Sequence, residues 1–184
     1  MFGRLFWAAL PLLGSTVGLA LPGLPHVGNL TTYTNVTIYN TDVGRQPSYA
    51  RTEELPNGDL LVTWGTFANY SLVYISKDSG KNWNPHGRID SHIYNATFFQ
   101  PAIYYLPEKI GEYDKGTILF SINAWSGNST NIELYASRDG GKKFDYVSLV
   151  TSGGRANTTN GATPVWEPFL LAKLVSATIR REAR

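Results

Sequence analysis

Short apolar runs alternate with clusters of turn residues along most of the chain. Between Thr31 and Leu171 the runs are rich in Val, Ile, Tyr, Phe and Trp, and Gly, Asn, Asp and Pro separate them. Such runs, bounded by turn residues and lacking helical periodicity, are typical of β-strands. The clearest predicted strands are Leu60–Trp64, Ser71–Ile75, Thr117–Ser121 and Asn131–Tyr135. The pattern therefore predicts an all-β fold.

One motif occurs twice, each time directly after a Tyr-containing strand. Ser76–Trp83 reads Ser-Lys-Asp-Ser-Gly-Lys-Asn-Trp, and Ser137–Phe144 reads Ser-Arg-Asp-Gly-Gly-Lys-Lys-Phe. A third unit opens at Val165–Leu170, which matches Phe98–Ile103. Self-similarity at this scale is typical of repeat architectures. We therefore expect two complete units of four strands each and the start of a third.

The repeated motif has the chemistry of a tight structural turn. Its Asp carboxylate can accept backbone N–H bonds, its Gly permits a positive φ, and its aromatic residue can pack under the sheet. The residues expected to build the two turns are Ser76, Asp78, Gly80, Trp83, Ser137, Asp139, Gly141 and Phe144.

The motif resembles the Asp box, or BNR repeat, of sialidase-like β-propellers. In that superfamily the Asp box is a structural turn on the face away from the catalytic site. The resemblance implies a six-bladed propeller, of which residues 21–171 supply about two blades and the start of a third. If Asp boxes join the third and fourth strands of each blade, the start of the first strand and the end of the second lie at the opposite face.

That topology predicts a site where the first strands line a central channel. The residues expected to contact substrate there are Tyr49, Arg51, Trp64, Gln100, Asn123, Trp125 and Trp166. Glu167 is the best catalytic candidate, because Trp166 and Pro168 flank it at a channel-facing strand start. From the residues alone, pairing with Arg51 of a neighbouring blade or with backbone donors is an equal alternative.

Other polar residues carry weaker expectations. Glu53 and Glu54 are expected to be solvated strand residues, and Glu108, Glu112 and Asp114 to form a polar hairpin. His86 and His92 are expected in the loop between the two repeat units, where with Asp90 they lack a third convincing metal ligand. We expect no metal and no other cofactor.

A finer resemblance concerns three segments: Gln46–Arg51, Asn57–Trp64 and Pro164–Leu170. Together they resemble glycoside hydrolase family 93, secreted fungal exo-arabinanases that release arabinobiose from α-1,5-L-arabinan. The resemblance implies a retaining mechanism with two glutamates, in which Glu167 is the acid/base. Retention requires two carboxyl groups about 5–5.5 Å apart, and the second glutamate is expected in a later blade.

Two alternatives remain open. A sialidase-type exo-glycosidase would require an Arg-Ile-Pro strand and an arginine triad, to which the segment Tyr49–Thr52 is a poor match. A noncatalytic carbohydrate-binding propeller would share the Asp boxes without the chemistry.

The amino terminus and the composition point to an extracellular glycoprotein. Residues 1–20 have the Arg4, Leu5–Leu13 and Gly18–Ala20 pattern of a signal peptide, with a membrane anchor as the rival interpretation. The chain has no Cys, and its +2 net charge comes from its ends, so nothing favours disulfides or nucleic-acid binding. Sequons stand at Asn29, Asn35, Asn69, Asn95, Asn128 and Asn157.

The carboxyl-terminal residues depart from the repeat pattern. Residues 172–184 contain neither the next turn nor an Asp box, which suggests either a truncated gene product or a short isoform. An open propeller exposes strand edges, so we expect this chain to fold poorly alone and to lack hydrolase activity. The full-length protein is expected to be a monomer that binds a polysaccharide or oligosaccharide, without nucleic-acid or membrane partners.

Overall fold

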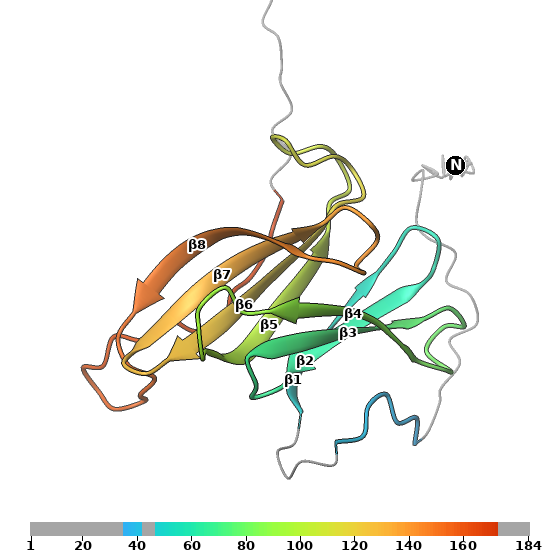
Figure 1. Cartoon of the computed structure of the whole chain (residues 1–184). Coiled ribbons are helices and arrows are strands. Elements are labelled where there is room, and N and C mark those ends of the chain that lie inside the picture. Colours follow the sequence, from blue (N-terminus) through green and yellow to red (C-terminus); the bar gives the residue numbers. More distant parts are fainter. Residues whose placement is uncertain (1–34, 42–46, 173–184) are drawn as a thin grey trace, which may run out of the picture. The chain divides into compact units, whose positions relative to one another are not determined.

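The computed structural model describes residues 35–41 and 47–172, which contain eight β-strands (Figure 1). The strands are β1 Ser48–Glu54, β2 Leu60–Gly65, β3 Tyr70–Ser76, β4 Asn84–Asp90, β5 Thr97–Tyr105, β6 Ile118–Ser126, β7 Ser129–Ser137 and β8 Asp145–Gly153. They form two antiparallel four-stranded sheets, ordered β1-β2-β3-β4 and β5-β6-β7-β8. The all-β fold and the two four-stranded units are confirmed, and the six-bladed propeller remains a prediction.

Some expectations fall on other parts of the chain. The predicted signal segment 1–20, the sequon at Asn29 and the tail from Lys173 lie outside the described residues. One strand assignment needs correction: His86 lies in β4, not in the loop after it. The sequence pattern did not predict this strand, because it contains Pro85 and Gly87. Both residues weaken a strand pattern and are tolerated mainly at sheet edges.

The two Asp-box turns have closely similar hydrogen-bond patterns. In the first, the Asp78 carboxylate accepts the Asn82 N–H at 2.8 Å, and the Ser76 hydroxyl accepts the Gly80 N–H at 2.8 Å. These bonds satisfy turn amides that no strand partner can reach.

The second turn repeats this arrangement. The Asp139 carboxylate accepts the amides of Lys142 and Lys143 at 3.1 and 3.0 Å, and the Ser137 hydroxyl accepts the Gly141 N–H at 2.9 Å. The hydrogen bonds to the Asp139 carboxylate, led by that from Lys143, hold the pKa of Asp139 below its ordinary value.

Strand register separates the Asp boxes from the predicted site. Ser48 pairs with Gly65 at one end of the first sheet, and Leu60 pairs with Ser76, the first Asp-box residue, at the other. The second sheet repeats this, since Thr97 pairs with Trp125 at one end, and Ile118 pairs with Ser137, the first residue of its Asp box, at the other. The starts of β1 and β5 therefore lie at the opposite end of each sheet from its Asp box.

The sheets share one apolar core. Leu61, Val73 and Ile89 from the first sheet are buried in the same cluster as Phe98 and Phe120 from the second. Figure 1 shows the two sheets side by side, with β5 next to the first sheet. Because each strand alternates its side chains, one face of each sheet can supply this common core.

A buried carboxylate ties the connection between the sheets to β7. Glu133 is fully buried and accepts the Ile93 N–H at 3.1 Å and the hydroxyls of Ser91 and Tyr135 at 3.1 and 2.8 Å. Burial and the neighbouring Glu133 raise the pKa of Tyr135 well above its ordinary value. No sequence pattern indicates this role, because Glu133 occupies an ordinary strand position and two of its partners, Ser91 and Ile93, lie in a distant loop.

The second Asp box also contacts the edge strand β4. His86 Nε2 lies 2.8 Å from the Gly140 carbonyl oxygen, and Arg88 forms a parallel bridge with Lys143. A Cβ placed on Gly87 would lie 2.1 Å from the Gly141 carbonyl oxygen. Only glycine therefore permits this backbone approach between the sheets.

We predict that Gly87→Ala separates the sheets and lowers the melting temperature by roughly 10 °C, since overpacking against backbone costs about 3 kcal/mol in a domain of this size. Thermal melts followed by circular dichroism measure the effect.

The matched control is Gly58→Ala, where a Cβ meets nothing within 4 Å and only the left-handed φ of 85° is strained. A Gly87→Ala melting temperature no lower than that of the control would contradict the close approach.

Candidate functional site

Three residues at equivalent positions of the repeats have left-handed backbone conformations. Tyr49, Gln100 and Glu167 have φ values of 54°, 48° and 42°. In β1 and β5 the pairing register shifts at this point, between Ser48 and Arg51 and between Phe99 and Ala102. A left-handed residue with a long side chain costs about 1–3 kcal/mol, and such strain and bulges cluster at functional sites. The threefold recurrence marks this end of the repeats as the candidate site.

Gln100 and Glu167 contact each other twice. The Gln100 Nε2 amide donates to the Glu167 carboxylate Oε1 at 3.3 Å, and the Glu167 N–H donates to Gln100 Oε1 at 3.3 Å. Gln100 is 7% exposed. Gln100, which the sequence predicts to contact substrate, therefore binds Glu167 through two hydrogen bonds.

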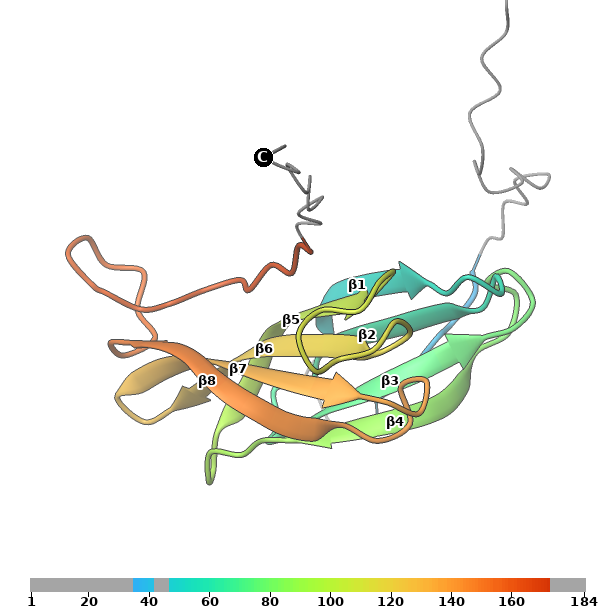
Figure 2. The same cartoon turned by 90° about the horizontal axis from the view of Figure 1, so that it is seen from above.

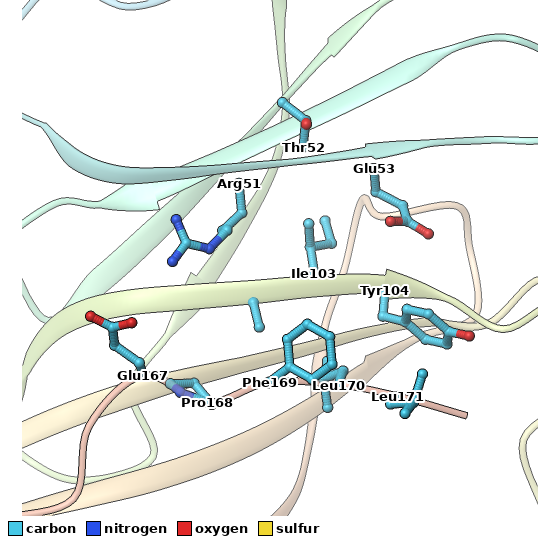
Figure 3. Close-up of a pocket in the computed structure, with 11 residues that line it drawn as sticks. Arg51, Thr52, Glu53, Ile103, Tyr104, Glu167, Pro168, Phe169, Leu170 and Leu171 are labelled. Carbon is cyan, nitrogen blue, oxygen red and sulfur yellow. The ribbon is translucent and has the colours of Figure 1, made fainter. Parts of the chain in front are cut away.

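A pocket of about 380 Å³ lies between β1, β5 and the segment after β8. Arg51 and Glu167 extend from facing segments into the same space, while Glu53 and Tyr104 lie farther along the pocket (Figure 3). Figure 2 shows the segment after β8, coloured orange to red, looping out beyond the end of the second sheet and then turning back. Arg51 donates to the Ala50 carbonyl oxygen at 3.1 Å. No ion pair joins Arg51 to Glu167 in the part of the chain that the structure describes.

Glu53 corrects a sequence expectation. Instead of being solvated, it is half-buried in this pocket, and its carboxylate accepts the Tyr105 N–H at 2.8 Å. Burial raises the pKa of Glu53 above its ordinary value, and the Tyr105 hydrogen bond opposes that shift. The available signal was the strand period, because residues 51 and 53 share one face of β1. Glu54, on the other face, is exposed as expected.

The predicted aromatic contacts divide into two groups. Tyr49, Trp125 and Trp166 are 43%, 36% and 40% exposed, so their rings remain accessible to a ligand. Trp64 is 3% exposed, and its indole packs against Tyr39 and Tyr74 with ring centroids 5.0 and 5.2 Å away. Trp64 therefore does not join the group around Glu167.

Asn123 is fully buried and does not line the pocket. Its Nδ2 donates to the Val165 carbonyl oxygen at 2.7 Å. The residue therefore contacts the chain segment that leads to Glu167.

The remaining candidate residues make contacts within the fold or lie on its surface. His92 stacks on Tyr146 with ring centroids 3.9 Å apart. Within residues 35–41 and 47–172, no group of three His, Cys, Asp or Glu side chains is placed to hold a metal ion, and no helix is long and apolar enough to span a membrane. The described sequon asparagines, all exposed, are Asn35, Asn69, Asn95, Asn128 and Asn157.

Comparison with known proteins finds that this chain is similar to solved structures of an α-L-arabinanase and of α-L-arabinofuranosidases. No protein-family model and no curated protein matches the chain. The solved structure of the Penicillium chrysogenum α-L-arabinanase with arabinobiose is 44% identical, with a TM-score of 0.72, over 78% of this chain and 44% of that chain.

Two Fusarium graminearum structures are also similar. The GH93 α-L-arabinofuranosidase with arabinobiose is 40% identical, with a TM-score of 0.66, over 70% of this chain and 38% of that chain. A mutant α-L-arabinofuranosidase with an iminosugar inhibitor is 39% identical over the same shares, with a TM-score of 0.66. The chain thus spans less than half the length of these structures. The predicted resemblance to family 93 is confirmed to the extent that the solved structures similar to this chain include a GH93 enzyme.

We predict that Glu53→Gln raises the melting temperature at neutral pH. The raised pKa means that the folded state holds the Glu53 proton more tightly than the unfolded chain does, so ionisation at neutral pH costs stability. Glutamine keeps an acceptor for the Tyr105 N–H without the buried charge. The gain should vanish as the pH falls below the ordinary glutamate range, where Glu53 is protonated in both states.

Melts of Glu53→Gln and of the exposed neighbour variant Glu54→Gln, recorded between pH 3 and 8, provide the comparison. An equal response of both variants would show that the position of Glu53 in the pocket has no effect.

Proposed function

We propose that this chain forms the acid/base half of the active site of a secreted exo-arabinanase that releases arabinobiose from α-1,5-L-arabinan. The observation that carries the proposal is the left-handed Glu167, held by Gln100 and facing Arg51 in a pocket. The two arabinobiose complexes among the structural neighbours supply the substrate class.

In the proposed mechanism, Glu167 donates a proton to the glycosidic oxygen as the bond to the leaving sugar breaks, while a second carboxylate attacks the anomeric carbon and forms a glycosyl-enzyme intermediate. The Glu167 carboxylate then removes a proton from water, which attacks the glycosyl-enzyme intermediate from the side the leaving group vacated. The Arg51 guanidinium, which has only donors, suits the hydroxyl oxygens of a neutral sugar. The exposed rings of Tyr49, Trp125 and Trp166 offer flat apolar surfaces for sugar faces.

The described residues do not supply a free second carboxylate for this mechanism. Glu53 is the other carboxylate lining the pocket, and its engagement with the Tyr105 N–H suits a structural role. We infer that the nucleophile lies outside the described residues, in a later blade of a six-bladed propeller. The 184-residue chain by itself is therefore expected to be inactive as a hydrolase.

The extracellular setting is part of the proposal. The signal-peptide pattern of residues 1–20 supports secretion, and the five described sequon asparagines are exposed, as glycosylation requires.

The test uses a chimera in which residues 35–171 replace the matching part of the P. chrysogenum arabinanase, so that the rest of the propeller is present. We predict that Glu167→Gln lowers the rate of arabinobiose release from linear arabinan by about 10²–10⁴-fold, the usual contribution of general acid–base catalysis. Chromatography of the released sugars measures the rate.

Glu112→Gln, which changes an exposed residue outside the pocket, is the control and should leave the rate unchanged. Undiminished release by the Glu167→Gln chimera would remove Glu167 from the mechanism. If the unmodified chimera bound arabinobiose in calorimetry but released none, the noncatalytic carbohydrate-binding function would replace the hydrolase.

A further inference from the structure

The segment that carries Glu167 is attached to the second sheet by side chains. The Val165 N–H donates to the Thr130 hydroxyl at 2.8 Å, and the Val165 carbonyl oxygen accepts from Asn123 Nδ2 at 2.7 Å. Thr130 lies on β7 and Asn123 on β6, which are paired neighbours in the sheet. Both backbone groups of one residue, two positions before Glu167, are therefore bound by this pair, which we call the Val165 clamp.

Thr130 is fixed in the orientation that the clamp needs. Its side chain is fully buried, and its hydroxyl donates to the Gly154 carbonyl oxygen at 3.0 Å while it accepts from Val165. A hydroxyl has only one proton to donate, so the bond to Gly154 leaves its lone pairs for the Val165 N–H.

Close packing at the end of β8 supports the same attachment. A Cβ placed on Gly153 would lie 2.6 Å from both the Thr163 carbonyl oxygen and the Val165 nitrogen. The Gly154 N–H also donates to the Thr163 carbonyl oxygen at 2.8 Å. The segment thus returns directly onto the sheet before it reaches Gln100.

Asn123 lowers the stability of the fold at this position. It is fully buried, and its Oδ1 has no hydrogen-bond partner among the described residues. A buried amide oxygen without a partner costs stability, which an apolar residue of similar size would avoid. Asn131, by contrast, is buried on β7 with both ends of its amide bonded, to Ala124, Ser129 and Ser152. The cost at Asn123 is explained if its role is to hold Val165.

We propose that Asn123 and Thr130 are positioning residues that fix the segment before Glu167. Gln100 can then bind the Glu167 carboxylate while the Glu167 backbone keeps its left-handed conformation. Neither residue lines the pocket that contains Glu167. Their effect on catalysis rests on the proposed function, whereas their effect on the segment does not. A displacement of a catalytic group by about 1 Å can lower the rate by about 100-fold, so such a clamp has a measurable role.

The experiment compares Thr130→Val, which keeps the shape and removes the hydroxyl, with Thr130→Ser, which keeps the hydroxyl. In the chimera, which supplies the neighbouring blades, amide hydrogen exchange of Val165, followed by NMR, should accelerate at least about 10-fold in Thr130→Val and stay near the wild-type rate in Thr130→Ser. In the chimera, kcat for arabinan should fall about 10-fold or more in Thr130→Val with KM changed less than about 3-fold, and Thr130→Ser should restore it.

Asn123→Leu provides a second test of the clamp if Thr130→Val does not fold. It removes the bond to Val165 and also the unpartnered oxygen, so its melting temperature should stay within about 4 °C of wild type while kcat falls. Asn131→Ala is the matched control: it should lower stability through lost hydrogen bonds yet retain kcat at a temperature where it is folded.

Equal Val165 exchange in Thr130→Val and Thr130→Ser would overturn the clamp, whatever the catalytic rate of the chimera. Accelerated exchange together with an unchanged kcat in an active chimera would overturn its positioning role. If the unmodified chimera is inactive, the proposed function fails, and the exchange rates alone then decide whether the clamp holds the segment.

Discussion

Burial of one common core by two sheets is the constraint on which the rest of this structure depends. A four-stranded sheet can exclude water from an apolar face only by packing it against another element. Here Leu61 and Val73 pack in one cluster with Phe98 and Phe120, and this places β5 beside β1. The candidate pocket follows from that placement, because its walls come from those two strands and the segment after β8.

Polar groups then fix the register that apolar packing leaves open. Glu133 ties the connecting loop to β7, and the second Asp box meets β4 where Gly87 leaves room for it. A buried carboxylate is stable only when donors surround it, and a close backbone contact requires a residue without a side chain. Both contacts are directional, so they determine how the two sheets are placed relative to each other.

Strain at the other end of the sheets has a related explanation. Tyr49, Gln100 and Glu167 adopt left-handed conformations that side-chain-bearing residues seldom take. For Glu167 the surrounding bonds hold that conformation, since Gln100 binds both its carboxylate and its N–H. Strain of this kind persists only where neighbouring structure over-determines the backbone, and such neighbours also give a catalytic group one defined position.

Local features of the structure were predictable from the sequence. The strands, the two units and the Asp-box turns depend on the alternation of side chains and on residues a few positions apart, which a sequence displays directly. The equivalence of Gln100 and Glu167 was also visible as a repeat. The burial of Trp64, the engagement of Glu53 with Tyr105 and the contact of Asn123 with Val165 were decided only by the tertiary structure. Each of these depends on which distant segment packs against the strand, and no local pattern records that choice.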